Sequence, residues 1–172
     1  QVECQGVKDT VYTGFAAVAL SLNGVDFTPG PMQYIYYFQP PVLSLYPDSG
    51  PARGGTRMHI IGDGFIFLTP FPPSCKFTCI HDRGKSIVMP ARYLNNTLLV
   101  CTTPNVSAWF ADSEMSVDAI VEISLNAQQF TELEALVFTF YVDPTITRAE
   151  QSERGNNIVV NGGEPVTVYG RK

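Results

Sequence analysis

Two segments of the chain alternate apolar side chains with small or polar ones at a period of two. They cover residues 16–22 and 117–125, and each runs into a turn that contains asparagine. An aromatic segment follows each turn, at residues 33–38 and 137–142. Alternation of this kind, together with aromatic and β-branched residues, favours strands on a half-buried sheet. The pattern therefore predicts two β-hairpins.

The rest of the chain leaves little room for helices. Its 13 prolines and 14 glycines are spread along the sequence and interrupt almost every window long enough for a helix. Residues 105–116 have a loosely helical pattern, and we expect a loop there. Hydrophobic residues make up 45% and charged residues 16% of the chain, which is enough apolar material for packed cores. We expect a folded, all-β protein.

The same landmarks occur twice, in the same order and about one hundred residues apart. The sequence SLNGVDFT at residues 21–28 returns as SLNAQQFT at 124–131, an offset of 124 − 21 = 103. Two further landmarks, residues 36–40 and 54–62, return at 140–144 (140 − 36 = 104) and 162–170 (162 − 54 = 108). Self-similarity at a fixed period marks tandem modules, and this period fits a small β-sandwich better than a short solenoid repeat.

Prolines mark the junctions between the predicted modules. Pro40-Pro41 and Pro144 close the aromatic strands, and new strands start directly after them at Val42 and Thr145. Proline restricts its own φ and biases the preceding residue towards extended backbone, so we expect stiff junctions and no flexible linker. The repeat phase predicts the end of one module at 1–40, a complete module at 41–144 and the start of a third at 145–172.

Glycines punctuate the start of the complete module. Gly54 and Gly55 provide positions where φ can be positive before a strand, and residues 62–64 form a second sharp turn. A phosphate-binding loop would need a helix after its glycines, whereas a strand follows here. We therefore interpret these glycines as folding punctuation.

An ordered series of motifs resembles a known family. The stretch VLSLYPDSGPARGGT at 42–56 is followed by MHIIGDGF at 58–65, then by CKF at 75–77, MPA at 89–91 and LLVCTTP at 98–104. This series resembles the IPT/TIG domain, the immunoglobulin-like fold of plexins, of the hepatocyte growth factor receptor family and of many protist surface proteins. The resemblance implies tandem immunoglobulin-like (E-set) β-sandwiches. Residues 145–161 lack the earlier proline and Ser-Gly-Pro turn, so the third module is either a divergent IPT/TIG start or a filamin-like or cadherin-like sandwich.

The same resemblance implies a disulfide between Cys75 and Cys101. Cys4 occupies the place in its own module that Cys101 occupies in the complete one, so its natural partner would lie upstream. Cys79 could compete for Cys101, pair with Cys4 or stay a buried thiol. The alternatives are reduced cysteines in a cytosolic protein, or a zinc site made of Cys75, Cys79, His81 and Cys101. The zinc site is disfavoured because a Cys-x-x-Cys knuckle is missing.

Two N-glycosylation sequons indicate the secretory route. Asn95 opens Asn-Asn-Thr in the expected turn before residues 98–101, and Asn105 opens Asn-Val-Ser in a loop. No signal peptide is visible at Gln1, and we expect that any such segment lies outside this chain. No apolar run is long enough for a membrane span, so we expect no membrane insertion by this segment.

The sequence contains no constellation typical of catalysis, and we predict no enzyme activity, no cofactor and no metal site. Its two histidines, His59 and His81, belong to no nucleophile elbow or metal-binding helix. Net charge is 11 − 16 = −5 without a basic run, which argues against nucleic acid as a partner.

The exposed aromatic residues are the candidate contact surface. They are the aromatic residues at 34–38 and, in the loop after Pro104, Trp109 and Phe110. Core and inter-module packing is the alternative for all of them, and Trp109 and Phe110 are the residues we expect to contact a partner. The expected partners are other protein chains, copies of the same chain and neighbouring immunoglobulin-like repeats.

The combined reading is a non-enzymatic extracellular or cell-surface structural or adhesion protein, a stiff rod that presents protein-binding surfaces. Family analogy suggests a protist or algal surface, a ciliary coat or a cell wall as its setting. Two alternatives remain open: an intracellular scaffold or transcription-factor-type TIG domain, and accessory domains of a carbohydrate-active enzyme.

Overall fold

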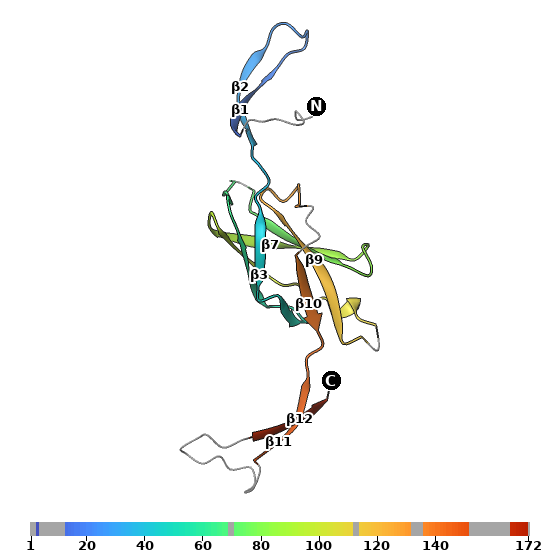
Figure 1. Ribbon diagram of the computed structural model, residues 1–172. Coiled ribbons are helices and arrows are strands. Elements are labelled where there is room, and N and C mark those ends of the chain that lie inside the picture. Colours follow the sequence, from blue (N-terminus) through green and yellow to red (C-terminus); the bar gives the residue numbers. More distant parts are fainter. Residues whose placement is uncertain are drawn as a thin grey trace. The chain divides into compact units, whose positions relative to one another are not determined.

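The computed structural model describes residue 3 and residues 13–68, 71–111, 114–131, 136–151 and 166–171, without the side chains of residues 29 and 151. The contacts divide the chain into two compact units, Gln1–Pro40 and Pro41–Lys172. The described residues form twelve β-strands and one short 3₁₀ helix (Figure 1). The all-β prediction is therefore confirmed.

The first unit contains one hairpin. Strands β1 (Gly14–Leu20) and β2 (Thr28–Tyr36) pair antiparallel, with an irregularity between Ala17 and Ala19. The first of the two predicted hairpins is thus present, with its turn at the asparagine-containing segment. Figure 1 shows it in blue.

The second unit holds a sandwich of eight strands in the order β3-β5-β8-β7-β6-β9-β10-β4. All neighbours are antiparallel except β10 and β4, which run parallel. The strands are β3 (Val42–Tyr46), β4 (Ser49–Pro51), β5 (Arg57–Gly62), β6 (Ser74–Cys79), β7 (Ser86–Asn95), β8 (Leu98–Thr102), β9 (Ser116–Ser124) and β10 (Val137–Tyr141).

Strand β7 belongs to both layers of the sandwich. Its first half, residues 86–90, pairs with β6, and its second half, residues 91–95, pairs with β8. The change of partner falls at Pro90, which has no N–H to donate to a sheet ladder. One layer is therefore β3-β5-β8-β7 and the other is β7-β6-β9-β10-β4.

The core lies between these layers. It is built from the side chains that point inward at alternate positions along the strands. Four large aromatic or aliphatic side chains with no exposed surface, Phe77, Phe138, Phe140 and Met58, come from β6, β10 and β5. The rings of Phe77 and Phe138 meet edge to face, with centroids 6.4 Å apart. The alternate apolar residues that predicted the strand at 117–125 are the residues that this strand contributes to the core.

After the sandwich, β11 (Thr145–Gln151) pairs antiparallel with β12 (Val166–Arg171) in a further hairpin. The predicted strand starts at Val42 and Thr145 are both confirmed. Between β8 and β9, the described residues of the segment expected to be a loop contain one 3₁₀ turn, η1 (Ser107–Trp109).

Candidate functional site

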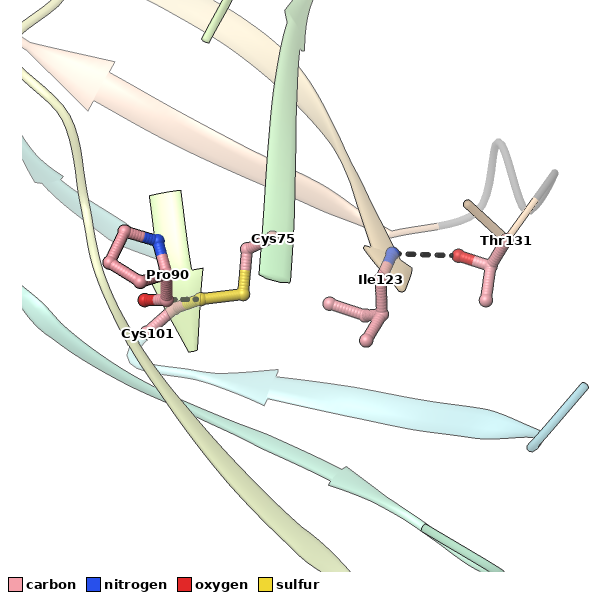
Figure 2. The surroundings of a disulfide bond; sticks show 5 residues. All are labelled: Cys75, Pro90, Cys101, Ile123 and Thr131. Carbon is pink, nitrogen blue, oxygen red and sulfur yellow. Dashed lines mark hydrogen bonds between the residues drawn. A yellow bond between two sulfur atoms is a disulfide. The ribbon is translucent and has the colours of Figure 1, made fainter. Parts of the chain in front are cut away.

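A disulfide crosses the core of the sandwich. Cys75 of β6 and Cys101 of β8 are bonded, with Cα atoms 6.6 Å apart and a sequence separation of 26. Both side chains are buried, and the Cys101 sulfur lies 3.8 Å from the carbonyl oxygen of Pro90 (Figure 2). The bond links one layer to the other beside the residue at which β7 changes partner, and it is the pairing that the family resemblance implied.

Cys79 is a buried free thiol at the end of β6. Its position matches one of the three alternatives that the sequence left open, and Cys4 lies outside the described residues. Within the described part of the chain, no three residues among His, Cys, Asp and Glu are grouped so that they could hold a metal ion. His81 is exposed in the segment after β6.

His59 lies on β5 with its Nδ1 3.3 Å from the carbonyl oxygen of Tyr46. In the first unit, burial raises the pKa of the Tyr37 phenol, and Tyr34 adds to the rise. Because a raised pKa favours the protonated form, Tyr37 is neutral at physiological pH and can donate a hydrogen bond.

Both sequon asparagines are exposed. Asn95 ends β7, and its Oδ1 accepts hydrogen bonds from the backbone N–H and the hydroxyl of Thr97, each at 2.9 Å. The Oδ1 of Asn105 accepts from the N–H of Ser107 at 3.0 Å, just before η1. The two asparagines lie near the two ends of β8.

Trp109 and Phe110, the expected contact residues, are half-buried. The indole of Trp109 lies edge-on to the ring of Phe140, with centroids 6.3 Å apart. Part of its surface therefore belongs to the core, and contact with a partner through the remainder stays a prediction.

The double-glycine turn closes one end of the sandwich. Gly54 and Gly55 have φ values of +76° and +88°, as expected from the sequence. The N–H of Gly55 donates to the carbonyl oxygen of Thr103 at 2.9 Å, and the N–H of Thr56 donates to the Thr103 hydroxyl at 3.0 Å. Thr103 is buried. It belongs to the LLVCTTP motif, but the sequence did not indicate these hydrogen bonds, because its partners lie about fifty residues earlier in the chain.

Sequence patterns also missed two arginines on the outer face of the layer β3-β5-β8-β7. Arg57 and Arg92 are exposed there and form no ion pair with the described residues. Isolated arginines carry no short motif, so only the strand register could place them on one face.

No helix in the described residues is long and apolar enough to cross a membrane.

Two packed β-layers, a switching strand and a disulfide between the layers define an immunoglobulin-like β-sandwich. The family model of the IPT/TIG domain matches residues 40–132, and the chain belongs to this family.

The same chain is similar to plexins along nearly its whole length. It is 24% identical to mouse (Mus musculus) Plexin-A4 and 26% identical to human (Homo sapiens) Plexin-A4, in each case over 99% of this chain and 8% of the relative. Among solved structures, the full extracellular region of plexin A4 matches with a TM-score of 0.52 and 18% identity, over 95% of this chain and 12% of that one. The chain thus spans less than a tenth of the length of these curated relatives.

Proposed function

We propose that this chain is part of an extracellular array of tandem IPT/TIG modules, in which stiff junctions space the modules and their surfaces bind other proteins. The proposal rests chiefly on one observation: the hairpin of the first unit repeats the β9–β10 hairpin of the sandwich in register, in turn geometry and in apolar positions.

Strand register is the same in the two hairpins. Gly14 pairs with Tyr36, and Val117 pairs with Phe140, at offsets of 117 − 14 = 103 and 140 − 36 = 104. The next inward pair, Ala16 with Tyr34, likewise corresponds to Ala119 with Phe138. A shift of one residue would have exchanged the two faces of a strand, so matched register means matched inward faces.

The turn after each first strand has the same hydrogen bonds. The Oδ1 of Asn23 accepts from the N–H groups of Val25 and Asp26 at 3.0 and 2.9 Å. The Oδ1 of Asn126 accepts from the N–H groups of Gln128 and Gln129 at 3.0 and 3.1 Å. An asparagine that caps its own turn in this way is a local device that fixes where each hairpin bends.

The hairpins differ in what covers them. Four apolar residues of the sandwich hairpin have only 0–2% of their surface exposed: Val121, Ile123, Leu125 and Phe138. Their counterparts in the first unit are much more exposed, with 48% for Val18, 45% for Leu20, 92% for Leu22 and 50% for Tyr34. An apolar face that is core in one copy and open in the other supports the reading of residues 1–40 as the end of a preceding module whose second sheet is contributed by other residues.

Residues 145–172 fit the start of a following module. Ile146, Val166, Val168 and Tyr169 are 67%, 48%, 57% and 43% exposed on the β11–β12 hairpin. Such a hairpin is marginal alone and needs further strands to cover its apolar side chains. Whether that module is IPT/TIG, filamin-like or cadherin-like remains a prediction.

An extracellular location is supported by the disulfide, the two exposed sequons and the similarity to the extracellular region of plexin A4. The intracellular alternative would require reduced cysteines, and an accessory role in a carbohydrate-active enzyme has no specific observation in its favour. The curated relatives are mammalian, and a protist, algal or ciliary setting stays an untested prediction.

Small-angle scattering on the natural protein, extended by one further module at each end, tests the array. A stiff array gives a narrow distribution of maximum dimensions. A variant with a Gly-Ser insert between Pro40 and Pro41 should broaden that distribution. An equally broad distribution in the unmodified protein would refute stiff spacing.

Secretion from animal cells tests the location. We expect glycosidase to increase the mobility of the wild-type chain, and a smaller shift for each of Asn95→Gln and Asn105→Gln. Free thiols at Cys75 and Cys101 together with unmodified asparagines would contradict the extracellular proposal.

A further inference from the structure

The two outer faces of the sandwich treat their charges differently. On the layer containing β6 and β9, Lys76 pairs with Glu122 at 2.8 Å, and the Thr139 hydroxyl on β10 donates to Asp118 at 2.7 Å. On that face both carboxylates, Glu122 and Asp118, have a partner within the face. On the opposite layer, Arg57 and Arg92 are exposed and have no acidic partner among the described residues.

Register places the cationic residues on one face. Alternating burial along β5 and β8 turns Met58, Ile60 and Cys101 inward. The outward residues Tyr46, His59, Val100 and Arg92 then form one row across four strands, because each is the register partner of the next. With strands about 4.8 Å apart, His59 and Arg92 stand on either side of Val100, roughly 10 Å from each other. Arg57 lies two residues from His59 on the same face.

Two exposed side chains with large apolar parts lie on the same face as these arginines. Tyr46 is 71% exposed and Ile61 is 40% exposed, and both extend the face beyond the arginines. The strand segments that form it, residues 42–46, 57–62, 91–95 and 98–102, contain no Asp or Glu, in a chain with 16 acidic residues. We call this surface the Arg57–Arg92 face and define it by Tyr46, Arg57, His59, Ile61, Arg92 and Val100.

We propose that the Arg57–Arg92 face binds an acidic protein segment whose carboxylates alternate with apolar side chains. Tyrosine and arginine are the residue types that dominate interface energetics, and arginine pairs with carboxylates through two parallel hydrogen bonds. A sulfated polysaccharide or a nucleic acid fits less well, since such polymers are bound by dense runs of Lys and Arg, and this face spreads two arginines among apolar residues.

This inference deepens the proposed role as a protein-binding module and does not depend on the array being stiff. A flexible array would leave the Arg57–Arg92 face unchanged. Conversely, failure of the face to bind acidic peptides would leave the spacing role intact. The two proposals therefore fail in different experiments.

Selection from a random 12-residue peptide library displayed on phage tests the proposal with the 172-residue chain. Phage that bind the wild-type chain are then incubated with an immobilised chain that carries Arg57→Glu and Arg92→Glu, and phage that bind this variant are discarded. The peptides of the remaining phage, the survivors, are sequenced. We expect survivors rich in Asp and Glu interleaved with apolar residues. Their affinity should fall about tenfold or more on the Arg57→Glu/Arg92→Glu chain and on Tyr46→Ala, and it should weaken with added salt.

A charge-matched control separates the face from net charge. Lys85→Glu with Arg148→Glu changes the chain by the same amount at two exposed ion pairs elsewhere, with Asp82 and Glu150, and should leave binding within twofold. Circular dichroism and the intact Cys75–Cys101 bond establish that each variant is folded. The proposal is overturned if no peptide survives depletion, if survivors are no more acidic than the starting library, or if a heparin oligosaccharide binds the face more tightly than they do.

Discussion

Thr131 and Ile123 bond to each other twice. The N–H of Ile123 donates to the Thr131 hydroxyl at 2.9 Å, and the N–H of Thr131 donates to the carbonyl oxygen of Ile123 at 2.8 Å. Figure 2 shows the first of these bonds. Both side chains are 1% exposed. This pair closes the β9–β10 connection, and its counterpart in the first unit is the register pair of Thr28 with Leu20.

Replacing Thr131 by valine should destabilise the sandwich by about 1–3 kcal/mol. The change keeps the shape of the side chain but removes the acceptor of the Ile123 N–H, and a buried donor without a partner costs its full desolvation. Thr131→Ser is the matched control and should retain most of the stability, because the hydroxyl remains. Urea unfolding measures both, and an unchanged valine variant beside a destabilised serine variant would show that the methyl group, not the hydrogen bond, matters.

Ala127→Gly should stabilise the protein by roughly 0.5–1 kcal/mol. Ala127 has a φ of +59° at the position where the first unit has Gly24 with +75°. A side chain in this left-handed region costs about 1–2 kcal/mol, and the greater freedom of glycine in the unfolded chain offsets part of the gain. Thermal unfolding reports the change. Ala108→Gly, at an exposed position of η1, should give no gain, and a destabilised Ala127→Gly would contradict the strain.

The elements of this fold were predictable because their signals are local. Period-two alternation located β9, and the aromatic segments located β2 and β10 to within a few residues. Prolines marked the strand starts at Val42 and Thr145 for the same reason: each acts on its own backbone and on the preceding residue.

What the sequence did not predict depends on contacts between distant residues. The exchange of partners along β7 at Pro90 follows from pairing with two strands at once. Placing Arg57 and Arg92 on one face requires the register of β5, β8 and β7. Trp109 was expected to face a partner, yet its ring also packs on Phe140, more than thirty residues later. The Cys75–Cys101 pairing came from family resemblance, since spacing alone allows other pairings.

Gly54 and Gly55 provide a matched test of backbone conformation against close packing. Both have positive φ, so alanine at either position should cost about 1–2 kcal/mol. A Cβ at Gly55 would meet nothing within 4 Å, whereas a Cβ at Gly54 would overlap the carbonyl group of Pro104. Gly54→Ala should therefore cost about 1–3 kcal/mol more than Gly55→Ala in urea unfolding. Equal losses would mean that the Pro104 backbone moves aside freely.

Removing the disulfide should lower the stability of the sandwich by about 3 kcal/mol. The Cys75–Cys101 bond closes a loop across a sequence separation of 26 residues, and a cross-link of that length removes much of the freedom of the unfolded chain. The double variant Cys75→Ala/Cys101→Ala therefore should unfold at lower urea concentration. Trp109 is the single tryptophan of the chain, and its ring contacts Phe140 of the sandwich core. Its fluorescence therefore reports unfolding of the sandwich and not of the β1–β2 or β11–β12 hairpin.

Cys79→Ala is the control for the disulfide, because Cys79 is buried but unbonded. It removes one sulfur from the core and should cost about 1 kcal/mol, in the range of small core truncations. Reductant should destabilise the wild-type chain and Cys79→Ala equally, and should leave the double variant unchanged. A wild-type chain whose tryptophan transition does not respond to reductant would show that the cross-link contributes nothing to the sandwich, and peptide mapping without reduction would then identify which cysteines are bonded.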